Sequence, residues 1–168
     1  MLTGGPSAGK TTMLLELKSR KYKTVDEAAR SYIEEQVSAG RTYAQIRADE
    51  AAFQRALVQK KIETERSLSR EDTIFFDRGM PDSVAYYELI GLQADSFLEE
   101  ALAACQYRKA FLLGLIPFEK DDIRKETPEE AARLNVLLRM SYENLGIPVV
   151  DVPVMPLPER IDFVLDNL

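Results

Sequence analysis

Residues 4–11 constrain the fold most strongly, because they read Gly-Gly-Pro-Ser-Ala-Gly-Lys-Thr and match the pattern G-x-x-x-x-G-K-[ST] at every position. Glycines allow a backbone to curl so that its N–H groups point toward an anion. The following stretch, 12–17, is typical of a helix, whose N-terminus adds free N–H groups and a positive dipole end. The motif therefore predicts a site for the phosphates of ATP or GTP.

Two side chains of this loop are expected to take part in chemistry. Lys10 can reach the β- and γ-phosphates, and the Thr11 hydroxyl can ligate Mg²⁺. A chance Gly-rich turn is the alternative, and it would lack the strand, helix and acidic strand end that accompany the motif. The residues expected to bind nucleotide are Gly4, Gly5, Pro6, Ser7, Ala8, Gly9, Lys10, Thr11 and Thr12.

Composition narrows the functional classes. The 168 residues fit a single domain, 1–168, and the net charge of −6 argues against a nucleic-acid partner, which needs a basic face. The chain contains no histidine, which excludes His-based triads and imidazole acid–base catalysis, so proton transfer would need a carboxylate. No apolar run reaches the length of a membrane span, and we expect a cytoplasmic protein.

Short apolar strands alternate with helical patterns along the chain. Strands are expected at 23–25, 73–76, 110–113 and 149–152. Helices are expected at 10–20, 28–39, 43–68 (as one or two helices), 81–90, 128–145 and 159–167, with a further one opened by a capping box at Ser96 and Glu99. This alternation predicts an α/β domain with a parallel sheet.

Only Met1, Leu2 and Thr3 precede the phosphate loop. The strand that feeds such a loop usually has about five or six residues. Either the first strand is unusually short, or residues are missing ahead of Met1. We favour the second interpretation, because so short a central strand would bury little.

In a parallel α/β sheet, ligands bind beyond the carboxyl ends of the strands. Asp77 ends an apolar strand, where an acid can orient Mg²⁺, although it could instead cap a helix. Arg78 could neutralise a phosphoryl group in transfer or hold a substrate anion, and its alternative role is a salt bridge. Both residues are candidates for catalysis.

Glu27 is the leading candidate for a general base, because it follows a strand end and the chain has no histidine. Asp26 is its rival, and acids are also favoured here simply by the dipole of the next helix. Arg30 lies one helical turn further on and could face the same cleft, so Glu27, Arg30 and Arg78 are the candidates for binding the acceptor substrate.

The irregular stretch 115–127 contains Lys120, Arg124 and Lys125. Long ordered loops in compact domains are often lids, and a lid arginine would stabilise the charge of phosphoryl transfer. We expect Arg124 to be that catalytic cation, with a solvated charged loop as the alternative.

The series GGPSAGKTT, VDEAAR, DRGMPDSVAYY, DDIRKETPEEA and LGIPVVDVP, taken in this order, resembles the predicted P-loop ATPase family that includes NadR-type ribosylnicotinamide kinase domains and Ttd-type nucleotide-binding proteins. The resemblance covers nearly the whole chain. It implies a three-layer, kinase-like P-loop NTPase with a five-stranded sheet in the order 2-3-1-4-5 and a lid loop.

The same resemblance suggests roles for individual residues. Lys10 and Thr11 would serve the phosphates and magnesium, Asp77 and Arg78 would be the acid–arginine pair, and Arg124 a lid cation. Glu27 matches the acid that faces the acceptor hydroxyl in related nucleoside kinases, and loop 151–156 would lie near the base. A ribosylnicotinamide substrate does not carry over, because members of the family differ in activity.

Two functional hypotheses follow. The first is a small-molecule kinase that transfers the γ-phosphate of MgATP to a nucleoside- or nucleotide-like acceptor. The second is a nucleotide-binding switch or slow NTPase whose state is read by a partner protein, for which the charged stretch 43–68 offers a surface. Phosphorylation of a small acceptor would favour the first, and tight binding with negligible turnover the second.

Overall fold

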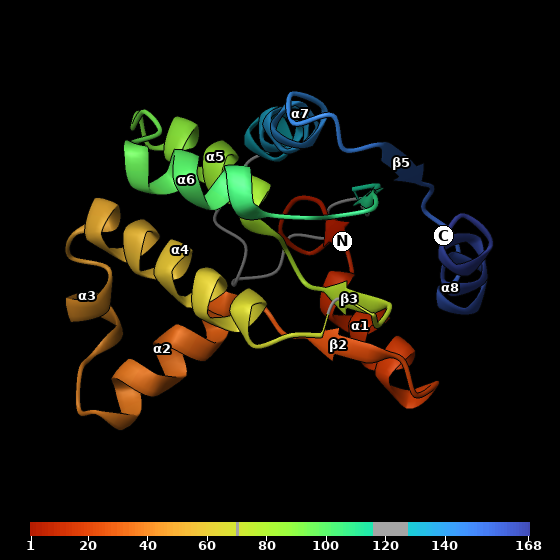
Figure 1. The fold of residues 1–168 in the computed structure, drawn as a ribbon, viewed down its shortest axis with the longest axis horizontal. Helices are drawn as coiled ribbons and strands as arrows, with labels where there is room; N and C mark the ends of the chain where they lie inside the picture. The colour runs from red at the N-terminus through yellow and green to blue at the C-terminus, as the bar shows by residue number, and fades with distance from the viewer. Residues whose placement is uncertain (70, 116–127) are drawn as a thin grey trace.

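The structure is a computed structural model that describes residues 1–69, 71–115 and 128–168. Within these ranges short parallel strands alternate with helices, so the expected α/β class is confirmed (Figure 1). The strands are β1 (Leu2–Thr3), β2 (Lys23–Val25), β3 (Ile74–Phe76), β4 (Ala110–Leu113) and β5 (Val149–Val152). The helices are α1 (Lys10–Ser19), α2 (Ala28–Ser38), α3 (Tyr43–Ile46), α4 (Glu50–Arg66), α5 (Met80–Leu89), α6 (Ser96–Ala104), α7 (Pro128–Glu143) and α8 (Leu157–Asp166).

Aspartate caps determine two of the helix starts. The stretch 43–68 forms two helices, because the Asp49 carboxylate accepts the backbone N–H of Ala52 and begins α4 there. At α6 the expectation of a Ser96 cap is wrong: Asp95 lies one residue earlier and accepts the N–H of Leu98. A carboxylate satisfies this exposed N–H group and also complements the helix dipole.

The strands do not form the single five-stranded sheet implied by the family resemblance. Ladders join β1, β4 and β5 in one sheet, in the order β1-β4-β5, and β2 and β3 in another. Among the described residues, one parallel bridge between Leu2 and Asp77 connects the two sheets. The physical reason is the register: Leu2 lies opposite Asp77, so both residues of β1 lie beyond the end of β3 at Phe76.

Helices cover both faces of the strands. Helices α1 and α8 pack on one face, while α5 and α7 contact each other and α7 packs on the other face of β4 and β5. Strand β4 shows why, since all four of its residues are buried and they alternate between the faces. Phe111 and Leu113 pack in the cluster that contains residues of α1 and α8, whereas Leu112 packs with residues of α5 and α7.

Helices α2, α3 and α4 form a separate lobe on the side of the molecule away from α8 (Figure 1). Ile46, Phe53 and Leu57 form the buried cluster between these helices, while Val58 of α4 packs against residues of α5 and α6. Arg47 places its guanidinium 4.3 Å from the centre of the Phe53 ring, a cation–π contact that closes the lobe at α3. The lobe borders the carboxyl end of β2, where Glu27 lies.

Candidate functional site

The phosphate loop leaves β1 and enters α1 through residues with left-handed backbone angles. Gly9 has φ 87° directly before α1, and Gly4 has φ 139°. A Cβ atom on Gly4 would meet the carbonyl oxygen of Leu113 at 3.0 Å, so both the space and the backbone angle require glycine. This loop fits the curled anion-binding conformation that the motif predicts.

Lys10 is buried beneath the loop. Its Nζ donates to the carbonyl oxygens of Gly4 and Gly5 at 3.1 and 2.8 Å, and the residue is 6% exposed. Burial lowers the pKa of Lys10 to about 7, with a further lowering from Arg78, while Asp77 and Glu27 oppose the shift. A phosphate group is the ligand that would restore the charge of this amine.

Thr11 and Asp77 lie together at the first turn of α1. The Thr11 hydroxyl donates to Asp77 Oδ2 at 2.9 Å. Asp77 is 2% exposed, and its other oxygen, Oδ1, is buried with no hydrogen-bond partner among the described residues. Burial raises the pKa of this carboxyl, and the Lys10 charge partly offsets the rise.

The Thr11–Asp77 pair fits a magnesium ion. An unpartnered carboxylate oxygen beside a hydroxyl offers hard oxygen ligands, which Mg²⁺ prefers. Among the described residues there is no group of three or more His, Cys, Asp or Glu side chains that would hold a metal alone. This suits an ion that is bound through one or two protein oxygens together with substrate phosphates.

Arg78 joins Glu27 to this group. Its Nε donates to Glu27 Oε1 at 2.9 Å and its Nη1 to Asp82 Oδ1 at 3.3 Å, and the side chain is 8% exposed. The guanidinium lies 5.2 Å from the centre of the Tyr86 ring. Burial alone would lower the pKa of Arg78, but Tyr86 and the neighbouring carboxylates raise it, so the cation is permanent.

The backbone of Arg78 is strained, because its φ of 67° lies in the left-handed region that non-glycine residues rarely adopt. Two contacts hold it there: the Arg78 N–H donates to the Leu2 carbonyl, and the Asp77 N–H donates to the Val25 carbonyl. These bonds tie the end of β3 to β1 and β2. Strain of this kind is typical of functional sites.

Asp82 was not singled out in the sequence, yet it is the most connected carboxylate here. It is fully buried and accepts hydrogen bonds from Thr3 Oγ1 (2.8 Å), the Gly79 N–H (2.9 Å), Arg78 Nη1 and the Tyr142 hydroxyl. Burial would raise its pKa, but Arg78 and Lys61 lower it, so Asp82 stays ionised. The only signal in the sequence is its place in the DRG-x-PD stretch.

Residues from distant helices brace the phosphate loop. The side-chain carbonyl of Asn135, on α7, accepts the Gly5 N–H at 2.7 Å. Arg160, on α8, donates from Nη1 to the Ala8 carbonyl at 3.1 Å and is 4% exposed, with Nε and Nη2 unpartnered among the described residues. Neither residue stands in a recognisable motif.

The other predicted site residues are exposed or lie outside the described residues. Asp26 and Arg30 are exposed, and the Arg30 side chain forms no ion pair with a described residue. Thr12 is exposed on α1. Arg124 lies outside the described residues. The structure therefore brings together Lys10, Thr11, Glu27, Asp77 and Arg78, while their catalytic roles stay predictions.

A cavity of about 290 Å³ adjoins Arg78 between α2 and α4. Asp26, Ser31 and Thr64 contribute polar groups to its wall, and Lys61 contributes an amine. The Lys61 Nζ donates to the Gly79 carbonyl at 2.7 Å and to Ser83 Oγ at 2.8 Å. Burial lowers the pKa of Lys61 to about 8, against the effect of Asp82.

Comparison with known proteins covers nearly the whole chain. A family model described as an AAA domain matches residues 1–160. No curated protein matches the chain in sequence. None of the described helices is both long enough and apolar enough to cross a bilayer.

Several solved kinases share the fold. Thymidylate kinase from Ehrlichia chaffeensis superimposes with a TM-score of 0.68 at 14% identity, covering 99% of this chain and 95% of the kinase. Deoxyadenosine kinase from M. mycoides gives 0.67 at 13%, covering 99% and 95%. NadR protein in complex with NAD and AMP-PNP gives 0.69 at 18%, covering 98% of this chain and 48% of NadR, so the chain spans about half of that protein.

Proposed function

Because the chain belongs to the AAA domain family, we propose that it is a small-molecule kinase, which transfers the γ-phosphoryl group of MgATP to a small acceptor. Its fold is that of a P-loop nucleoside kinase-like NTPase. The observation that carries the proposal is the Thr11–Asp77 pair in front of the loop, in which Asp77 Oδ1 is buried without a partner among the described residues. A buried polar atom without a hydrogen bond is costly, which suggests that a ligand completes this site.

The loop would bind the nucleotide. Residues 4–12 would surround the phosphates and offer them backbone N–H groups, except at Pro6, which has none, and Gly5, whose N–H is bonded to Asn135. Lys10 would exchange its two carbonyl partners for phosphate oxygens. Thr11 and Asp77 would hold Mg²⁺, which supplies charge neutralisation at the phosphates. ATP is favoured over GTP because the NadR protein of the same fold was solved with AMP-PNP.

Glu27 would accept the proton of the acceptor. The acceptor oxygen attacks the γ-phosphorus, its proton passes to Glu27, and the bond to the bridging oxygen breaks to release ADP. Glu27 is suited to this role because Arg78 binds only Oε1, which leaves Oε2 without a described partner on a side chain that is 29% exposed. Arg78 would hold Glu27 in place and face the transferred group.

The acceptor would enter beside Arg78, at the cavity between α2 and α4. Its volume of about 290 Å³ suits a small molecule rather than a polymer. Arg30, exposed on α2, is proposed as an outer contact for the acceptor. Arg124 is proposed as the lid cation that closes over the phosphates.

The test is transfer of labelled γ-phosphate from ATP to a panel of small hydroxyl compounds. Glu27→Gln should lower kcat about 100-fold or more while nucleotide affinity stays within about twofold, because Gln still accepts the Arg78 N–H but cannot take a proton. Glu34→Gln, an exposed change on the same helix, is the matched control and should leave kcat unchanged. Lys10→Ala should remove triphosphate binding.

Unchanged nucleotide affinity and turnover in Lys10→Ala would overturn the nucleotide site itself. Tight nucleotide binding with transfer to no compound in the panel, and no effect of Glu27→Gln on slow hydrolysis, would instead support the nucleotide switch. The two results separate a failure of the phosphate site from a failure of the acceptor assignment.

A further inference from the structure

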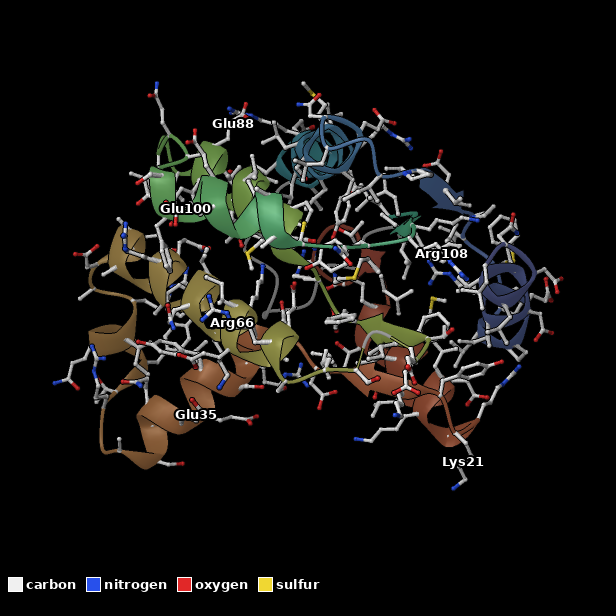
Figure 2. All side chains as sticks on the ribbon, viewed as in Figure 1. Lys21, Glu35, Arg66, Glu88, Glu100 and Arg108 are labelled. Carbon is white, nitrogen blue, oxygen red and sulfur yellow. The ribbon has the colours of Figure 1, made fainter. Side chains whose placement is uncertain are left out.

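Arg160 on α8 is one of the most enclosed charged residues of the described chain, together with Lys10, Asp77 and Asp82. Charged side chains usually lie at the surface, as the exposed Lys21 labelled in Figure 2 does. Asp77 and Asp82 both raise the pKa of Lys10, so opposite charges accompany one another in that group. Arg160 is different, because it has no such companion among the described residues.

No described carboxylate compensates the Arg160 charge. The residue is 4% exposed, and burial lowers the pKa of its guanidinium with no carboxylate acting in the opposite direction. Its Nη1 donates to the Ala8 carbonyl oxygen at 3.1 Å, while Nε and Nη2 are buried without a hydrogen-bond partner in the described ranges. Because a guanidinium stays protonated in proteins, the positive charge persists and opposes folding.

The hydrogen bond from Arg160 fixes the direction of one peptide group of the loop. Ala8 is fully buried, and no other described group donates to its carbonyl oxygen, because the first bond into α1 runs from the Met13 N–H to the Gly9 carbonyl. The described peptide bonds are trans, so a C=O group and the N–H group that follows it point in opposite directions. Holding the Ala8 carbonyl toward α8 therefore turns the Gly9 N–H away from α8.

The Gly9 N–H is available to a ligand. It makes no hydrogen bond with a described residue, and Gly9 is the residue directly before α1. An anion at the N-terminus of α1 would meet this N–H already free and held in direction. The Arg160 charge lies at the other end of the same peptide group, so it raises the positive potential at the N–H without contacting the anion.

We propose that Arg160 is a positioning residue for phosphate binding: it holds the Ala8–Gly9 peptide with its N–H turned toward the phosphates, and its uncompensated charge strengthens their attraction to the loop. The inference rests on the proposed nucleotide site and adds a residue of α8 to it. It also accounts for the missing carboxylate, because a paired acid would cancel the positive potential that the loop offers to an anion. The alternative is an arginine that only ties α8 to the loop.

Calorimetric titration of variants with MgATP and with tripolyphosphate tests the proposal. Arg160→Met removes the charge and the donor, and should raise both dissociation constants about 10-fold or more. Arg160→Lys keeps the charge and one donor, and should stay within about threefold of the parent chain. Arg20→Met is the matched control, because Arg20 is an arginine at the far end of α1 that is paired with Glu16 and Asp162, and it should change neither constant beyond about twofold.

Amide NMR separates positioning from a structural tie. A hydrogen bond to phosphate moves an amide proton downfield, so the Gly9 signal should shift when tripolyphosphate saturates the parent chain and Arg160→Lys. The shift should be much smaller in saturated Arg160→Met. An arginine that only ties α8 to the loop would lower the unfolding midpoint of Arg160→Met while its affinity and its Gly9 shift stay those of the parent chain, and this result would overturn the proposal.

Two further outcomes distinguish this inference from the proposed function. A parent chain that binds tripolyphosphate without any movement of the Gly9 signal contradicts the role of Arg160 but leaves the nucleotide site in place. A parent chain that binds neither MgATP nor tripolyphosphate refutes the nucleotide site, and the inference with it. If Arg160→Met does not fold, Arg160→Gln replaces it, because Gln is neutral but keeps an N–H donor, and affinity equal to that of the parent chain would then count against the role of the charge.

Discussion

At the residue scale, buried charges with incomplete sets of partners surround the phosphate loop. Asp77 lacks a partner at Oδ1, and Arg160 lacks partners at two nitrogens among the described residues. Within the described ranges, Lys10 donates hydrogen bonds only to backbone carbonyl oxygens, which carry no net charge to neutralise it. Each of these arrangements costs folding free energy. We interpret them as groups arranged for an anion and a cation that arrive together.

Asp77→Asn tests this interpretation, which implies that the Asp77 carboxylate lowers stability but is needed for function. Asn can still accept the Thr11 hydroxyl but carries no charge, so the desolvation cost disappears and the free energy of unfolding should stay equal or rise by about 1 kcal/mol. Mg²⁺-dependent turnover should fall about 100-fold or more. Asp162→Asn, which changes an exposed carboxylate of α8, is the control and should alter neither quantity by much.

Chemical denaturation and steady-state kinetics measure the two quantities on the same preparations. A marked loss of stability in Asp77→Asn with full turnover would show that Asp77 is structural, and would contradict the proposed magnesium role. The alternative that Asp77 merely caps a helix is already disfavoured, because its described hydrogen bond goes to a side chain of α1.

At the scale of elements, the sequence predicts the features that depend on neighbouring residues or on general rules of parallel sheets. Strand ends of a parallel sheet share one edge, and this rule alone places Glu27, Asp77 and Arg78 beside Lys10, as the structure shows. The turn at Asp49 and the two-sided burial of β4 also follow from local chemistry.

The remaining contacts could not be read from the sequence, because they join residues far apart in the chain. Thr3 and Asp82 are 79 positions apart, Gly5 and Asn135 are 130 apart, and Ala8 and Arg160 are 152 apart. An isolated Asn or Arg on a helix gives no signal of its destination. The division of the sheet has a different reason: the family resemblance implies a strand order, whereas the ladder between β1 and β3 depends on their register.

Asp82 tests how strongly one side chain joins these elements. Its four donors come from β1, the end of β3, the start of α5 and α7, and Asn would turn an N–H group toward two of them. Asp82→Asn should therefore lower the free energy of unfolding by about 3–5 kcal/mol. Asp49→Asn is the matched control, because Asn caps a helix as well as Asp does, and should cost less than about 0.5 kcal/mol.

At the scale of the whole molecule, β1 lies between the phosphate loop and a cavity of about 620 Å³. Its carboxyl end leads into the phosphate loop, and Met1, directly before its amino end, lines that cavity. Asp82 binds Thr3 between them, and Arg78 binds Leu2 through its N–H.

The burial of amine groups in different parts of the molecule predicts how the free energy of unfolding changes with pH. The pKa of the Met1 amine is about 5 when folded and 8.0 when exposed, that of Lys10 is about 7 against 10.5, and that of Lys61 is about 8 against 10.5. In each window the unfolded chain binds more protons, so the free energy of unfolding rises with pH, from 5 to 8 through Met1, from 7 to 10.5 through Lys10 and from 8 to 10.5 through Lys61. The folded chain should thus be more stable at pH 9 than at pH 6, by a few kcal/mol.

Carboxyls with pKa values raised by burial, Asp77 and Glu65, act in the opposite sense from their ordinary values upward, so variants must separate the groups. Acetylation of the Met1 amine should reduce the slope between pH 5 and 8, most clearly below pH 7, where Lys10 does not yet contribute. Lys61→Met should reduce the slope above pH 8 to the part that Lys10 supplies, whereas Lys60→Met, which removes the neighbouring amine paired with Glu35, should not. Urea unfolding at fixed pH values measures both slopes, and an acetylated chain with an unchanged slope below pH 8 would show that the Met1 amine is not buried as described.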